Sequence, residues 1–146
     1  MKISAEIIID FENARRYWKI AVNFINRNLS RIFRITKRLV FNIKHVHVPG
    51  FVTILTNTWF DKKIYGNKLV DQSIIEYLRT EFNAKALILV AADNDYAQVL
   101  QELKSRGVYI IVVGHTVARK LYEIADEYYV VDLSAIPEPA VIPVKQ

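Results

Sequence analysis

The fold is decided by residues 86–114, which read ALILVAADNDYAQVLQELKSRGVYIIVVG. Ala86–Ala92 is a short apolar run, which is typical of a strand buried on both faces of a parallel sheet. Tyr96–Arg106 has helical spacing and stops at Gly107, the position where glycine commonly ends a helix. Tyr109–Val113 is a second apolar run. This order of strand, helix and strand predicts a parallel βαβ unit.

The same alternation continues on both sides of this unit. The expected strands and helices are Lys2–Asp10 (strand), Phe51–Thr56 (strand), Leu69–Phe82 (helix), Val117–Ala125 (helix) and Tyr128–Asp132 (strand). They predict an α/β fold, a three-layer open sandwich with a mainly parallel central sheet and helices on both faces. The length of 146 residues suits one domain over residues 1–133, followed by a Pro-rich tail at 134–146.

Positive charge is concentrated in one segment of the chain. Residues 13–60 contain nine Lys and Arg and no acid, although the net charge of the whole chain is only +5. Apolar residues recur at helical spacing from Trp18 onward, which predicts a basic amphipathic helical segment at about 14–40. Its polar face carries Arg27, Arg31, Arg34 and Arg38. Such a face suits a nucleic-acid backbone. An anionic membrane surface is the alternative, but the apolar face is needed to cover the sheet.

Several classes of function are excluded by what the sequence lacks. It has no cysteine, which excludes disulfides, thiolate metal sites and a cysteine nucleophile. It has no Gly-rich phosphate loop, which argues against a nucleotide cofactor. No apolar stretch is long enough to span a bilayer, and no export signal is present, so we expect a cytoplasmic protein that does not enter membranes. Its aromatic residues are compatible with a homodimer.

Polar side chains follow the predicted strands where the strands end. The acids and amides at the first two of these ends are Asp10, Glu12 and Asn13, then Asp93, Asn94 and Asp95. Ligand sites of open α/β sheets form outside the carboxyl ends of the strands. Carboxylates gathered there repel one another unless a cation neutralises them, and oxygen ligands favour Mg²⁺ or Mn²⁺.

Two further positions belong with these acids. Asp71 opens the predicted helix at 69–82, and Gly114, His115 and Thr116 follow the strand at 109–113. Asp71 and Asp95 also suit the role of a helix N-cap, which would need no metal.

Four segments closely resemble the NYN domain of the PIN-like nuclease superfamily. They are IIIDFEN (7–13), KLVDQSII (68–75), LILVAADNDYAQVLQELKSRGVYIIVVG (87–114) and KLYEIADEYYVVDL (120–133). The resemblance implies a PIN-like, Rossmann-like sheet and assigns the metal-site positions to Asp10, Asn13, Asp71, Asp93 and Asp95. The chain departs from the pattern at Tyr77, where many members carry a further Asp.

The resemblance implies a Mg²⁺- or Mn²⁺-dependent endoribonuclease that leaves 5′-phosphate and 3′-hydroxyl ends. Asp10, Asp93 and Asp95 would hold the ion, and Asp71 would be a direct or water-mediated ligand. Asn13 would orient a water or a phosphate oxygen, while Lys68 and Thr116 would contact phosphates. Two alternatives stay open: an RNA-binding or scaffold module without activity, which Tyr77 favours, and a small-molecule phosphatase, which the basic segment disfavours.

Overall fold

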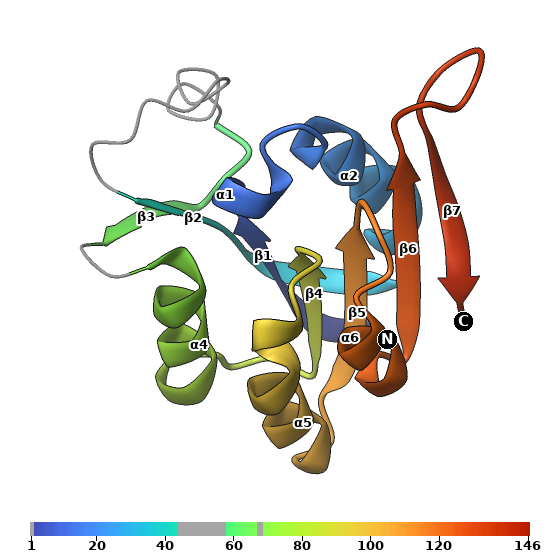
Figure 1. Ribbon diagram of the computed structural model, residues 1–146. Coiled ribbons are helices and arrows are strands. Elements are labelled where there is room, and N and C mark those ends of the chain that lie inside the picture. The colour runs from blue at the N-terminus through green and yellow to red at the C-terminus, as the bar shows by residue number, and fades with distance from the viewer. Residues whose placement is uncertain (1, 44–57, 67–68) are drawn as a thin grey trace.

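A computed structural model describes residues 2–43, 58–66 and 69–146 (Figure 1). In this part of the chain seven strands form one sheet in the order β3-β2-β1-β4-β5-β6-β7. The strands are β1 (Ile3–Asp10), β2 (Phe33–Ile43), β3 (Lys62–Gly66), β4 (Ala86–Val90), β5 (Tyr109–Gly114), β6 (Glu127–Asp132) and β7 (Ala140–Lys145). The helices are α1 (Phe11–Ala14), α2 (Trp18–Phe24), α4 (Val70–Thr80), α5 (Ala97–Ser105) and α6 (Arg119–Ile124). A π-helical turn, Ile25–Leu29, extends α2, and a 3-10 turn, Asn94–Tyr96, precedes α5.

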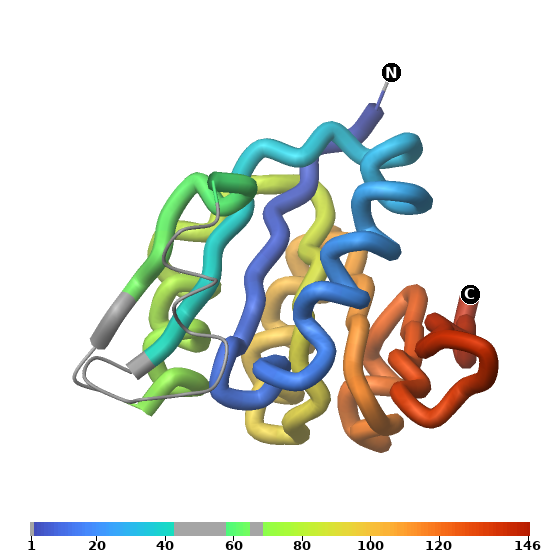
Figure 2. Tube along the Cα trace, turned by 90° about the horizontal axis from the view of Figure 1, so that it is seen from above, coloured from blue at the N-terminus to red at the C-terminus, as the bar shows by residue number. Residues whose placement is uncertain are grey.

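Helices lie on both faces of the sheet (Figure 2), and the sheet separates two apolar cores, as the three-layer prediction requires. On β1, Ile7 and Ile9 point to the face covered by α1 and α2, while Ile8 points to the face covered by α4, α5 and α6. Successive side chains of a strand alternate between faces, so a central strand covered on both faces is mostly apolar. All neighbouring strands from β3 to β6 are parallel, which confirms the predicted α/β open sandwich.

The prediction of helix over residues 14–40 is wrong in its second half. Helical structure ends at Leu29, and Phe33–Ile43 is the strand β2, parallel to β1. Its apolar residues fit a helical spacing and a two-residue alternation about equally well, and aromatic and β-branched residues favour a strand. The decisive contact is long-range: β2 pairs with the whole length of β1, whose backbone would otherwise be an unpaired edge.

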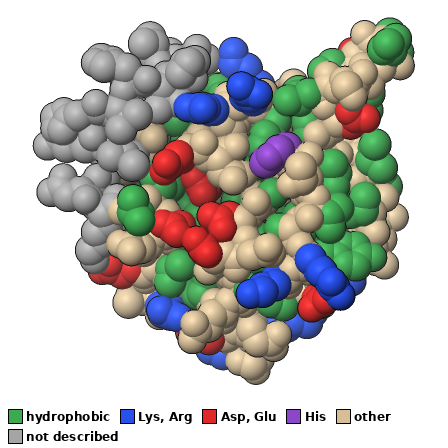
Figure 3. Space-filling view, viewed as in Figure 1, with side chains coloured by type: hydrophobic (Ala, Val, Ile, Leu, Met, Phe, Trp, Pro, Cys, Tyr) green, Lys and Arg blue, Asp and Glu red, His purple; other side chains and the backbone are tan. Residues whose placement is uncertain are grey.

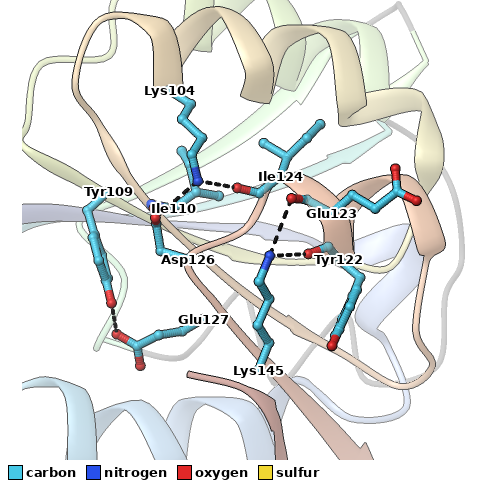
Figure 4. A network of polar contacts seen from close by, with 9 residues as sticks. All are labelled: Lys104, Tyr109, Ile110, Tyr122, Glu123, Ile124, Asp126, Glu127 and Lys145. Carbon is cyan, nitrogen blue, oxygen red and sulfur yellow. Dashed lines mark hydrogen bonds and ion pairs between the residues drawn. The ribbon is translucent and has the colours of Figure 1, made fainter.

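The prediction of a loose tail after residue 133 is also wrong in part. Ala140–Lys145 forms β7, the antiparallel edge strand beside β6. Pro143 is tolerated because an edge strand leaves one row of its backbone groups outside the ladder. Lys145 Nζ donates to the carbonyl oxygens of Tyr122 and Glu123, at 2.8 and 3.3 Å, which ties β7 to α6 (Figure 4).

The same region contains a second lysine contact that joins α5 to the start of β6. Lys104 Nζ donates to the Ile124 carbonyl at 2.7 Å and forms an ion pair with Asp126 at 3.0 Å (Figure 4). Asp126 also accepts from the Ile110 N–H at 2.8 Å. These contacts hold the β5–β6 side of the sheet at the edge opposite to the strand ends that carry the predicted site.

The expected strand Phe51–Thr56 lies outside the described residues. β3, which the sequence did not predict, pairs with β2 at the other edge of the sheet. The chain therefore goes from β1 to β2 and β3 on one side and then crosses to β4 on the other. This reversal next to β1 is the topological switch point where α/β sheets bind ligands.

Candidate metal centre

Three carboxylates from two separate elements meet above the switch point. Asp71 lies in the first turn of α4, and Asp93 and Asp95 lie in the segment after β4. One oxygen from each lies within 4.8 Å of the others. Asp93 also caps the 3-10 turn, since its Oδ1 accepts from Asp95 N–H at 2.9 Å. Asp93 therefore has the capping role that the sequence left open for Asp95. The second carboxylate oxygen of Asp93 remains for a ligand.

The electrostatics of this group favour a cation. The pKa of Asp95 is raised, chiefly by the charge of Asp93 and further by burial and by Asp71, and the charge of Lys120 opposes this. Among the residues that the structure describes, no Lys or Arg forms an ion pair with Asp71, Asp93 or Asp95. Hard oxygen donors with unneutralised charge fit Mg²⁺ or Mn²⁺.

Asp10 lies deeper than these three. It ends β1, is 4% exposed, and accepts from Tyr96 Oη at 2.7 Å and from Asn13 N–H at 3.1 Å. Burial raises the pKa of Asp10 to about 6, although both hydrogen bonds lower it. The buried carboxyl is thus oriented by two donors and is close to half ionised near pH 6.

Asn13 joins two segments of the site that are far apart in sequence. Its Oδ1 accepts from Tyr17 Oη at 2.9 Å and from Ala92 N–H at 3.0 Å. The carboxamide oxygen is therefore committed to positioning the segment that carries Asp93. For the predicted contact with a water or a phosphate oxygen, only the amide nitrogen of Asn13 remains as a donor.

Gly114 is required where this segment meets the end of β5. A Cβ on Gly114 would lie 2.8 Å from Ala92 Cβ and 3.0 Å from the Ala91 carbonyl oxygen. Any side chain there would push against the backbone just before Asp93. Glycine at the end of the predicted strand therefore permits a close approach that holds the carboxylates in place.

The acids enclose a cavity of about 310 Å³. It is lined by Asp10, Glu12, Asn13, Leu69, Asp71 and Asp93. Figure 3 shows the acidic side chains gathered in this hollow. Asp71 and Asp93 belong to both the cavity wall and the 4.8 Å group. Asp10 forms part of the wall only, and Asp95 is an exposed member of the 4.8 Å group only.

The predicted RNA-binding residues are not gathered around this cavity. The arginines at 27, 31, 34 and 38 share no helical face, because Arg34 and Arg38 lie on β2. Arg34 pairs in register with Ser4, about 20 Å along β1 from Asp10 at the usual rise per residue. Arg38 forms an ion pair with Asp61 at 3.6 Å. The cationic helix predicted to hold RNA is therefore absent from the described chain.

The remaining predicted contacts have different outcomes. Thr116 is exposed after β5, and its carbonyl accepts from Tyr128 Oη at 2.7 Å. Lys68 lies outside the described residues. Arg15 and Arg16, which the sequence analysis left out of the site, are the exposed bases beside the cavity wall, next to Asn13.

Tyr77 occupies the position at which the resemblance drawn from the sequence implies a further acid. It is 7% exposed, and its hydroxyl donates to Glu6, which is buried in β1. Glu6 also accepts from Asn83 N–H at 2.8 Å. The Tyr77 hydroxyl is therefore used against β1 and does not line the acidic cavity.

Sequence reasoning missed two residues that shape the site. Tyr96 orients Asp10, and Leu69 forms the apolar wall of the cavity, which Glu12 also lines. Tyr96 could have been found, because it directly follows Asp93, Asn94 and Asp95 in the sequence and carries a hydroxyl that can donate to a carboxylate. Leu69 carried no signal, since a single apolar residue before a helix is common.

The fold and the site together define an α/β protein with an acidic cavity at the switch point of its sheet. The NYN domain model matches residues 4–133, so the chain belongs to the NYN domain family. The family indicates a nuclease-like, RNA-related function, and NYN nucleases generally use divalent metals. A search of curated proteins finds no match.

A solved structure shares the architecture. It is a crystal structure of a protein of unknown function from Vibrio parahaemolyticus, with a TM-score of 0.62 and 16% sequence identity. The match covers 90% of this chain and 94% of that one. At this identity the likeness supports the fold alone. No helix in the described ranges has the length and apolar character needed to cross a bilayer.

Proposed function

We propose that the chain is a Mg²⁺- or Mn²⁺-dependent endoribonuclease. The observation that carries this proposal is the convergence of Asp10, Asp71 and Asp93 on one cavity, with a carboxylate oxygen of Asp95 within 4.8 Å of those of Asp71 and Asp93. These residues come from β1, α4 and the segment after β4, so a common helix cap cannot explain them. The NYN family supplies the RNA-related chemistry with which this site is consistent.

Asp71, Asp93 and Asp95 would hold the ion, with Asp10 as a further ligand. A bound divalent cation lowers the pKa of water and offsets charge that develops on the phosphate. Tyr96 and the Asn13 N–H keep the Asp10 carboxylate in one orientation, and the Asn13 carboxamide keeps the Asp93 segment against α1. Such preorganisation costs no rearrangement when charge develops in the transition state.

A non-catalytic RNA-binding module is the second candidate, and one observation favours it. The Tyr77 hydroxyl is bound to Glu6, so α4 offers Asp71 to the cavity without the additional acid found in many members. A protein of this kind would keep the fold and bind RNA but would not cleave it.

The test is cleavage of labelled single-stranded, structured and circular RNAs with Mg²⁺, Mn²⁺ or EDTA. The wild type is compared with Asp93→Asn and with Asp61→Asn as the matched control. Asp61 is an exposed Asp that forms an ion pair with Arg38. Exposed ion pairs contribute little to stability, so the loss of this one is expected to leave folding intact. We expect metal-dependent cleavage, including of the circle, in the wild type and the control but not in Asp93→Asn.

Other results would contradict the proposal in different ways. RNA binding without cleavage under any metal would support the second candidate. Cleavage that persists in Asp93→Asn would exclude this cavity as the site. Hydrolysis of a small phosphate ester with no cleavage of RNA would support the phosphatase alternative. If cleavage requires RNA with free ends, the protein is an exonuclease and not an endonuclease.

A further inference from the structure

A second cavity lies directly beside the acidic one. Its volume is about 320 Å³, within the range typical of small-ligand sites. It is lined by Glu12, Asn13, Arg15, Arg16, Tyr17, His115 and Leu133. Glu12 and Asn13 line both cavities, so one wall separates the carboxylates from this second space.

An aromatic platform forms one side of the second cavity. The His115 and Tyr17 rings lie 5.3 Å apart between centroids, tilted by 36°. Tyr17 is 2% exposed and is anchored through its hydroxyl to Asn13 Oδ1, whereas His115 is exposed at the end of β5. The buried ring thus supports an exposed ring that is available for stacking against a planar ligand.

Positive charge in the second cavity comes from the turn between α1 and α2. Arg15 and Arg16 are exposed there, and neither forms an ion pair or a side-chain hydrogen bond with any residue in the described ranges. Figure 3 shows basic side chains and the imidazole on the same face as the acidic hollow. Two unpaired guanidinium groups next to a stacking ring are a combination suited to phosphate and base together.

We infer that this second cavity binds the nucleotide adjoining the scissile phosphate of single-stranded RNA. Arg15 and Arg16 bind its phosphate, and its base stacks on His115. Glu12 in the shared wall repels phosphate, which directs the phosphate toward the arginines. The inference rests on the proposed nuclease function and adds a positioning subsite to it. In place of the predicted cationic helix, which the described residues do not form, this subsite supplies the local contacts to the RNA backbone.

The test measures binding of fluorescein-labelled hexaadenylate RNA to the full chain by anisotropy, in EDTA so that no cleavage occurs. The variants are Arg15→Ala/Arg16→Ala, His115→Ala and His115→Phe. The matched control is Arg31→Ala/Arg34→Ala, which removes the same charge from exposed side chains away from the cavity. Circular dichroism checks that each variant is folded.

We expect Kd to rise about tenfold or more in Arg15→Ala/Arg16→Ala and less than about threefold in the control. The slope of log Kd against log salt is expected to fall by about 1.4 in the first double variant, at about 0.7 per phosphate contact on a single strand. His115→Ala is expected to raise Kd about fivefold or more, and His115→Phe to restore it, because stacking tolerates any aromatic ring.

Equal losses in the two double variants would overturn the inference, since they would show that only total charge matters. Failure of the wild type to bind hexaadenylate would overturn it as well. The proposed function fails separately. Binding that depends on Arg15 and Arg16 without any cleavage would leave the subsite standing and contradict the nuclease. Cleavage whose KM is unchanged in Arg15→Ala/Arg16→Ala would leave the nuclease standing and contradict the subsite.

Discussion

Glu6 and Asp10 are two buried acids on the same strand and the same face of the sheet. Each accepts a hydrogen bond from a tyrosine hydroxyl and another from a backbone N–H. For Glu6 the donors are Tyr77 and Asn83, and for Asp10 they are Tyr96 and Asn13. Three residues lie between the two acids, and both point toward the core covered by α4 and α5.

What differs is the access of each carboxyl to the acidic cavity. Glu6 is 0% exposed and lines none of the described cavities, whereas Asp10 forms part of the cavity wall beside Asp71 and Asp93. The comparison teaches that hydrogen bonding does not distinguish a structural acid from a site acid in this protein. Position relative to the ends of the strands does, because ligands reach the sheet only there.

The largest expected difference between the two acids is in activity. Asp10→Asn should lower the rate of RNA cleavage about hundredfold or more, because it removes a charged ligand from a preorganised site. Glu6→Gln should change the rate only a few-fold at a temperature where the variant is folded. Both substitutions keep the shape of the side chain, and initial rates with Mg²⁺ are the measurement. Equal losses would remove the distinction between the two acids.

The next largest expected effect is the dependence of stability on pH that Asp10 causes. Burial raises the pKa of Asp10 from 3.8 to about 6, so the folded state holds this proton more tightly than the unfolded state does. The stabilisation is complete below about pH 4 and is lost as pH rises through about 6. In EDTA the free energy of unfolding should fall by at most about 3 kcal/mol over this window, at 1.36 kcal/mol per pKa unit.

Urea unfolding between pH 4 and 8 measures this change. Asp10→Asn should make the decline of stability with pH much shallower. The pKa of Asp95 is raised as well, so Asp95 should add a smaller decline in the free energy of unfolding as pH rises. A profile that falls as steeply in Asp10→Asn as in the wild type would assign the proton to another group.

Removal of the two tyrosine hydroxyls should give a smaller difference. Tyr77→Phe is expected to lower the free energy of unfolding by about 2 kcal/mol, since it leaves an acceptor of the sealed Glu6 carboxyl unpaired. Tyr96→Phe should cost less, because the Asp10 carboxyl faces a cavity that water can enter. Urea unfolding at one fixed pH compares them, and the opposite order would mean that the Asp10 environment is the drier one.

Metal binding should give the smallest effect and should appear only on the Asp10 side. Addition of Mn²⁺ to EDTA-treated protein should raise Tm by a few degrees, since a ligand that binds only the folded state stabilises it. Asp71→Asn should abolish this shift, and Glu6→Gln should retain it. Thermal unfolding followed by circular dichroism is the measurement. A shift that survives in Asp71→Asn would place the ion elsewhere.

The parts of the fold that the sequence predicted are those with a strong local pattern. The apolar runs that became β1, β4 and β5, and the helix that stops at Gly107, were recognisable because burial on both faces leaves little polar sequence. β2 was mistaken for a helix, because Phe33–Ile43 fits both periods and only its pairing with β1 decides between them. β7 was missed because an edge strand can carry proline.

The residues of the site also divide into those that a local pattern predicted and those that only long-range contacts bring together. By itself the sequence determined that Asp10, Asp93 and Asp95 follow buried strands, because the position of a residue at the end of a strand is a local property. The tertiary structure decided that β1 and β4 are neighbours, that Asp71 joins their acids, and that Tyr96 and Tyr77 serve two different carboxyls. These contacts join residues far apart in the chain, and only packing of the whole sheet and its helices brings them together.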